Sequence, residues 1–187
     1  FAGKLGEKKG PDVLLDAFLQ LENEEAHLAV VGSGPMEEAL KDKAGGHPRV
    51  HFLGFQNQSR MPVVYRLGDL IAVPSRSETW GLAVNEAMAC GRPVVVSEKV
   101  GCAPDLVDEA NGRVVPAEEA DALADALDDL LADRDRLRAL GRRSAEGIQY
   151  WSIGVAADRT VDAVRSAVGV EVEGEKFVEP SMELQEV

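Results

Sequence analysis

The fold is decided by a stretch that reads Ser75-Arg-Ser-Glu-Thr-Trp-Gly-Leu-Ala-Val-Asn-Glu-Ala-Met-Ala-Cys-Gly-Arg-Pro93. An apolar run at residues 70–73 precedes it and stops at Pro74, which is typical of a buried strand followed by a loop. A helix is expected to begin near Gly81 and to end at Gly91. A strand, a loop and a helix N-terminus in this order place backbone N–H groups where an anion can bind.

Two glutamates stand in this stretch on either side of the expected helix start. Glu78 belongs to the loop, and Glu86 lies about five residues beyond Gly81, or roughly 7 Å along the helix axis. One carboxylate can therefore lie on each side of a bound phosphate, which suits a sugar–diphosphate–ribose ligand. Because Glu86 is surrounded by apolar residues, it needs hydrogen-bond donors. The hydroxyl groups of a bound ribose could supply these donors. Alternatively, Glu86 could form a structural salt bridge to Arg92 or Arg76.

Predicted strands and helices alternate along the whole chain. The expected strands are residues 1–5, 27–31, 50–53, 69–73, 93–97 and 112–115. The pattern predicts an α/β fold, a Rossmann-like doubly wound parallel sheet of about six strands. We expect one domain over residues 1–168 and an acidic, mobile tail over residues 169–187. Ligands of such sheets bind at the carboxyl ends of the strands, where the glycine-containing loops fall.

Composition narrows the class of protein further. The 187 residues are 45% apolar and carry a net charge of −13, which makes nucleic acid an unfavourable partner. No apolar run has the length of a membrane span. Cys90 and Cys102 match no metal-ligand spacing, and two reduced thiols predict a cytoplasmic protein. The acidity also suits a salt-rich cytoplasm, and the start at Phe1 inside a predicted strand indicates a piece of a longer chain.

Glu78 through Glu86, followed by Ala-Met-Ala-Cys-Gly-Arg-Pro-Val-Val, resembles the donor-site motif of GT-B glycosyltransferases, and most closely that of glycosyltransferase family 4 (group 1). The resemblance covers roughly residues 1–168 and implies the C-terminal, donor-binding half of a GT-B architecture. It implies transfer of a sugar from a UDP- or GDP-sugar to an acceptor with retention of configuration, without a cofactor or a metal. The acceptor site, and any membrane contact, would belong to a missing N-terminal domain.

The resemblance also implies roles for single residues. Lys9 matches the family lysine that grips the diphosphate, and Lys4 stands where the family usually has arginine, so the charge is kept but the bidentate fork is lost. Glu78 would orient the sugar, which makes Glu78, Lys9 and Lys4 the implied catalytic set. Glu86 would hold the ribose.

Further donor-binding residues come from four segments. They are Gly3 beside Lys4, Gly34 in Gly32-Ser33-Gly34-Pro35, Phe52 and Leu53 beside the base, and Arg76, Gly81, Leu82 and Ala83 around the helix start. The Gly32–Gly34 loop does not complete a dinucleotide fingerprint, because Glu37 stands at the third glycine position.

Two other functions remain open at this point. One is a non-catalytic nucleotide-sugar-binding module, and the other is a nucleotide-sugar epimerase of GT-B shape. An epimerase would need acidic and histidine side chains around the sugar, and His27, His47 and His51 look badly placed for that. Asp133-Arg134-Asp135 resembles a metal-binding Asp-x-Asp motif, but we expect it to join two helices far from the site.

Overall fold

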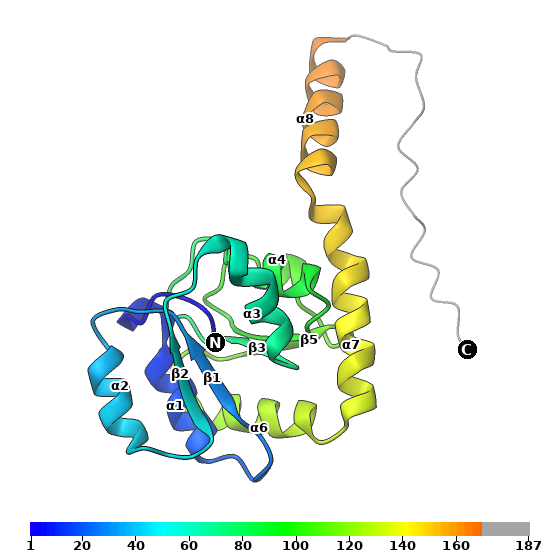
Figure 1. The fold of residues 1–187 in the computed structure, drawn as a ribbon. Helices are drawn as coiled ribbons and strands as arrows, with labels where there is room; N and C mark the ends of the chain where they lie inside the picture. The colour runs from blue at the N-terminus through cyan, green and yellow to red at the C-terminus, as the bar shows by residue number, and fades with distance from the viewer. Residues whose placement is uncertain (170–187) are drawn as a thin grey trace. The chain divides into compact units, whose positions relative to one another are not determined.

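The structure is a computed structural model that describes residues 1–169 (Figure 1). The chain divides into two compact units, Phe1–Tyr150 and Trp151–Val187. The predicted tail at residues 169–187 lies outside the described residues, apart from Gly169.

The first unit contains five parallel strands in two sheets, one of two strands and one of three, where a single sheet of about six was expected. β1 (Leu28–Val31) pairs with β2 (Val50–Gly54), and β4 (Val94–Ser97) lies between β3 (Ile71–Val73) and β5 (Gly112–Val115). The parallel α/β class is confirmed, but the sixth expected strand, at residues 1–5, is reduced to one bridge between Ala2 and Val31. The pairing does not extend because the chain turns directly after Val31, at Gly32, whose φ is +135°.

Helices connect the strands. They are α1 (Pro11–Leu19), α2 (Glu37–Ala44), α3 (Met61–Leu67), α4 (Leu82–Ala89), α5 (Ala103–Leu106), α6 (Ala120–Leu131) and α7 (Arg134–Gly147), with short 3-10 turns η1 (Glu7–Lys9), η2 (Gln58–Arg60) and η3 (Ile148–Trp151). The helix expected between Gly81 and Gly91 is present as α4, within two residues of the expected ends. In the second unit, α8 (Ile153–Val168) begins at Ser152, whose side chain accepts the N–H of Val155.

Hydrophobic cores cover both faces of the β3–β4–β5 sheet. Alternate residues of the central strands face opposite ways: Ala72 and Val95 pack with α1 and α6, whereas Val73 and Val94 pack with α4. Figure 1 shows α3 and α4 on one side of β3–β5 and α6 on the other. This is the doubly wound arrangement, and its loops meet at the carboxyl ends of the strands. None of the helices within residues 1–169 is both long and apolar enough to span a bilayer.

Candidate functional site

A cleft of about 670 Å³ opens where β1 and β2 end. Its wall is built from the first residues of the chain, the loops after β1 and β2, and side chains of η2, α3 and α4. The lining residues are Ala2, Gly3, Lys4, Val31, Gly32, Ser33, Gly34, Phe55, Gln56, Gln58, Met61, Tyr65 and Glu86. The volume is that of an ordinary small-molecule site, at the sheet edge where such folds bind ligands.

Bare backbone forms the part of the wall that follows β1. A Cβ atom at Gly32 would overlap the carbonyl oxygen of Gly3, and one at Gly34 would overlap the carbonyl oxygen of Leu5. The N–H of Leu5 donates to the carbonyl of Ser33 at 3.0 Å, which holds the two segments together. Glycine is therefore required at these positions by close backbone approach. The predicted residues Gly3, Gly34 and Lys4 lie in this wall, with Lys4 exposed.

Glu86 enters the cleft from α4 and is half-buried. Its Oε2 accepts the hydroxyl of Tyr65 at 2.7 Å, and its Oε1 accepts the amide of Gln58 at 3.1 Å. Burial, and then the hydrogen bond to Glu86, raise the pKa of Tyr65 far above its ordinary value, so the phenol stays protonated as a donor. A carboxylate has about four lone-pair sites, so two remain for ligand hydroxyls.

The salt bridges considered for Glu86 do not form. Arg92 donates through Nη2 to the carbonyl of Arg66 at 3.2 Å. Arg76 makes four hydrogen bonds elsewhere: two to Asp12, at 2.8 and 2.7 Å, one to Glu118 at 2.9 Å and one to the carbonyl of Glu7 at 2.8 Å. Because a guanidinium has five N–H groups and four hydrogen bonds are already made, Arg76 has little capacity left to bind a nucleotide sugar. Its geometry favours a structural role in place of the expected ligand contact.

Lys9 and Glu78, which the resemblance implies to be catalytic together with Lys4, bind each other. Lys9 lies at the end of η1 and forms an ion pair with Glu78. The backbone of Glu78 is held on both sides, because its N–H donates to Lys99 at 3.1 Å and its carbonyl accepts the N–H of Gly101 at 2.9 Å. The pair lies outside the set of residues that line the cleft. The structure thus brings a fixed carboxylate and an ammonium together beside the start of α4.

Gly81 caps the N-terminus of α4 with φ +105°. A Cβ there would lie 2.7 Å from Cγ1 of Val100, so glycine is needed both for the turn and for the packing. Leu82 is 68% exposed and Ala83 half-buried. The first N–H groups of a helix have no partner within the helix, so these positions remain available to an anion.

The residues expected beside the base are placed differently. Phe52 is half-buried and packs against the core, Leu53 is exposed, and neither lines the cleft. Phe55 and Gln56 line it instead, and Phe55 is 73% exposed. Strand β2 continues to Gly54, so the chain reaches the cleft only after that residue, and contact with a base stays a prediction. Tyr65 and Gln58 were missed, because a tyrosine at helical spacing reads as a core residue.

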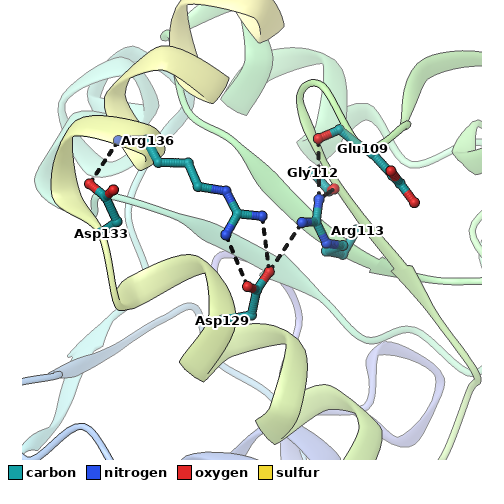
Figure 2. A network of polar contacts seen from close by, with 6 residues as sticks. All are labelled: Glu109, Gly112, Arg113, Asp129, Asp133 and Arg136. Atoms are coloured by element: carbon teal, nitrogen blue, oxygen red, sulfur yellow. Dashed lines mark hydrogen bonds and ion pairs between the residues drawn. The ribbon is translucent and has the colours of Figure 1, made fainter.

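The Asp133-Arg134-Asp135 sequence is a helix cap. Oδ1 of Asp133 accepts the N–H of Asp135 at 2.9 Å at the start of α7. It also accepts the N–H of Arg136 at 3.0 Å (Figure 2). These hydrogen bonds hold the pKa of Asp133 below its ordinary value. Within residues 1–169, no three His, Cys, Asp or Glu side chains are grouped as a metal site would require.

Comparison with known proteins gives a consistent result. The family model described as glycosyl transferases group 1 matches residues 1–147. The D-inositol 3-phosphate glycosyltransferase of Nocardia farcinica is 34% identical over 180 residues, which are 90% of this chain and 40% of that protein. The chain therefore spans about two fifths of the length of this relative.

Solved structures resemble the chain as well. HepE of Anabaena, crystallised with UDP and also with UDP-glucose, superposes with a TM-score of 0.77 at 25% identity, over 88% of this chain and 47% of that one. Sucrose-phosphate synthase of Thermosynechococcus elongatus gives a TM-score of 0.75 at 30% identity, over 88% of this chain and 44% of the other.

Proposed function

The chain belongs to the glycosyl transferases group 1 family, and on that premise we propose that it is the donor-binding part of a longer enzyme that transfers a sugar from a nucleotide-diphosphate sugar to an acceptor. The observation that carries the proposal is Glu86, a carboxylate with free lone pairs in the wall of a cleft of about 670 Å³ that is also lined by the backbone of Gly32 and Gly34. A ribose with vicinal hydroxyls is the ligand that suits such a carboxylate. The missing length relative to the curated relatives supports an acceptor domain elsewhere in the parent chain.

The ribose, the base and the diphosphate of the nucleotide sugar each have a proposed binding group in this chain. Glu86 accepts the ribose hydroxyls, and the ring of Phe55 packs against the base. Lys4 and the N–H groups of Gly81, Leu82 and Ala83 hold the diphosphate, whose charge they neutralise. UDP is our first choice of nucleotide, because HepE was crystallised with it.

The transfer step breaks the bond between the anomeric carbon and the diphosphate oxygen. A bond forms to the acceptor oxygen, whose proton is released, and the nucleoside diphosphate leaves with the bonding electrons. Lys9 and Lys4 would stabilise the charge that builds on this leaving group. Glu78, fixed by Lys99 and Gly101, would orient the sugar. We propose retention of configuration from the family resemblance alone.

The alternatives gain no support from the structure. His27 and His51 contact each other, with ring nitrogens 2.9 Å apart, and His47 meets the ring of Phe18 edge-on. None of the three lines the cleft, so an epimerase would lack its histidines there.

Two free cysteines agree with a cytoplasmic location, which we propose for the parent enzyme.

The first test is calorimetric titration of the 187-residue chain with UDP and GDP. Glu86→Gln should weaken UDP binding about tenfold or more, since a hydrogen bond to a charged group contributes about 1.5–3 kcal/mol. Glu146→Gln, an exposed glutamate of α7, is the matched control and should bind as the wild type does. Equal UDP affinity in wild type and Glu86→Gln would remove Glu86 from the site.

The second test asks what the chain can do alone. It should bind the nucleotide but release no nucleoside diphosphate from a donor, because catalysis also needs an acceptor held against the anomeric carbon and water excluded. Turnover on the order of 1 per second or faster, with or without simple sugar acceptors, would show that this one domain suffices for catalysis and would contradict the proposed architecture.

A further inference from the structure

A second concave site, of about 310 Å³, lies beside α7. Its wall combines one face of α7 with the segment at residues 91–93 that leads into β4, and with Asp69, which precedes β3. These segments enter their strands, whereas the cleft residues Gly32–Gly34 and Phe55 leave theirs. The two sites are therefore at opposite ends of the strands, and what binds in one does not touch the other.

Four arginines line this site, which we call the arginine pocket: Arg92, Arg134, Arg138 and Arg142. Asp69 is the only carboxylate residue in its lining, although the chain as a whole has a net charge of −13. Arg134, Arg138 and Arg142 follow one another at intervals of four residues and so share a face of α7. Like charges at that spacing destabilise a helix unless an anion lies among them.

Some arginines elsewhere in the first unit are paired with carboxylates, whereas Arg49 donates to the backbone carbonyls of Asn23 and Ala26. Figure 2 shows Arg113 and Arg136 both bound to Asp129, at distances from 2.9 to 3.2 Å. Arg76 is bound by both oxygens of Asp12. Carboxylates therefore neutralise several guanidinium groups outside the arginine pocket.

The arginines of the pocket keep most of their donors. Arg142 forms no ion pair with any residue of the range 1–169, and Arg134 reaches Glu25 only at 4.0 Å, with both side chains exposed. Arg138 binds Asp135, its neighbour on α7, at 3.0 Å. Nε of Arg92 is buried and has no hydrogen-bond partner among the described residues. This buried N–H is costly, but an anion in the pocket would meet the exposed guanidinium groups of Arg134, Arg138 and Arg142.

We propose that the arginine pocket binds a phosphate group, as inorganic phosphate or as a small phosphomonoester. The planar fork of arginine matches two phosphate oxygens at once, and four arginines line this pocket. The volume is near the lower limit for small-molecule sites, so a phosphate with a short organic part fills it. Leu137 and Ala145 supply an apolar surface for that part.

The base of the pocket is rigid. A Cβ at Gly141 would overlap the carbonyl oxygen of Gly91, so α7 packs directly on the backbone that leads into β4. The guanidinium groups of Arg138 and Arg142 are thus carried by a helix in fixed contact with the segment that carries Arg92.

Calorimetric titration of the 187-residue chain with sodium phosphate and with glycerol phosphate, at a constant ionic strength of about 0.1 M, tests the proposal. The variant Arg138→Gln/Arg142→Gln keeps good helix formers at both exposed positions, and its phosphate affinity should fall at least about tenfold. Arg143→Gln, on the same helix and paired with Glu146, is the matched control and should bind phosphate as the wild type does. UDP affinity should be equal in all three proteins, which separates this site from the cleft.

A further arm identifies the source of the phosphate group. Vesicles that contain phosphatidic acid are offered to the same three proteins. If soluble phosphomonoesters bind and vesicles do not, the ligand is a free metabolite, whereas vesicle binding that the double variant loses assigns the same phosphate chemistry to a lipid headgroup. The proposal is overturned if the wild type binds neither, or if the double variant, shown to be folded by its circular dichroism, binds as tightly as Arg143→Gln.

Discussion

Tyr65 sets the geometry of the carboxylate that the donor is proposed to meet. The residue is 2% exposed, and its hydroxyl donates to Oε2 of Glu86 at 2.7 Å. Gln58 donates to the other oxygen. Because each oxygen of Glu86 accepts a hydrogen bond, the plane of the carboxylate is fixed, and its remaining lone pairs point in set directions. Tyr65 is thus a positioning residue, which acts on the ligand through Glu86.

Replacing Tyr65 by Phe removes this hydroxyl and keeps the ring in the core. We expect UDP to bind several-fold more weakly, since one hydrogen bond contributes about 1 kcal/mol. A uridine diphosphate that lacks the ribose hydroxyls should bind wild type and variant equally, because it makes no contact with Glu86. Calorimetry with both nucleotides measures the difference, and Tyr150→Phe, at the other tyrosine of the chain, is the control. A loss of equal size for both nucleotides would reduce Tyr65 to a packing role.

Arg76 and Asp12 link the loop after β3 to the start of α1. The hydrogen bonds from Arg76 hold the pKa of Asp12 below its ordinary value. A carboxyl group whose pKa is depressed by folding stabilises the protein above its unfolded pKa of about 4, and this stabilisation is lost as the pH falls through the folded value.

Asp12→Asn should therefore lower the free energy of unfolding by about 1 kcal/mol at neutral pH, the upper end for a partly exposed pair. The difference between variant and wild type should shrink below about pH 4. Urea unfolding at several pH values measures it, with Asp42→Asn, an exposed carboxylate of α2, as the control. A difference that stays constant down to the lowest pH would contradict this account.

At the scale of elements, the turn between β1 and α2 is held by close backbone packing. Gly34 has no positive φ, so its requirement for glycine comes only from the overlap that a Cβ would make with Leu5. Gly6 directly follows Leu5, and nothing is within 4 Å of the Cβ that Gly6 could carry. Replacing each glycine by alanine therefore distinguishes the effect of steric crowding, at Gly34, from the effect of lost backbone freedom, at Gly6.

Gly34→Ala should destabilise the protein by about 1–3 kcal/mol, the usual cost of overpacking. It should also weaken UDP binding, since the backbone wall of the cleft must move. Gly6→Ala should change both quantities little, or stabilise slightly by restricting the unfolded chain. Urea unfolding and UDP titration of both variants decide the matter. Equal stability of the two variants would mean that the wall is pliable.

The connection between α6 and α7 is held by hydrogen bonds and ion pairs to two aspartates. Asp133 caps α7, while Asp129, near the end of α6, binds Arg136 of α7 and Arg113 of β5 (Figure 2). Carboxylates here satisfy a helix N-terminus and two guanidinium groups. An Asp-x-Asp sequence therefore finds its partners within the protein and does not need a metal to explain it.

At the scale of the whole molecule, the net charge of −13 should govern the response to salt. Self-repulsion destabilises the compact state at low ionic strength, and salt screens charges beyond about 10 Å at 0.1 M. The melting temperature should therefore rise between dilute buffer and about 1 M KCl. Thermal unfolding followed by circular dichroism measures this, and a flat or falling melting temperature would count against an adaptation to salt.

The sequence by itself determined the alternation of strands and helices, the helix start at Gly81 and the position of Glu86 on that helix. These features depend on apolar periodicity and on glycine, which act over a few neighbouring residues. The one strand predicted in excess lies at residues 1–5, where the pairing partner turns away at Gly32. Strand pairing is a property of two segments, and the sequence of one does not show it.

Only the tertiary structure decided which groups surround the site residues. Glu86 meets Tyr65 across 21 positions of the chain, Arg76 meets Asp12 across 64, and Lys9 meets Glu78 across 69. The same holds for Phe55, which lines the cleft where Phe52 and Leu53 were expected. At such separations local patterns carry no information, because the distance between two side chains is set by how the parallel strands are ordered and by where each of them ends.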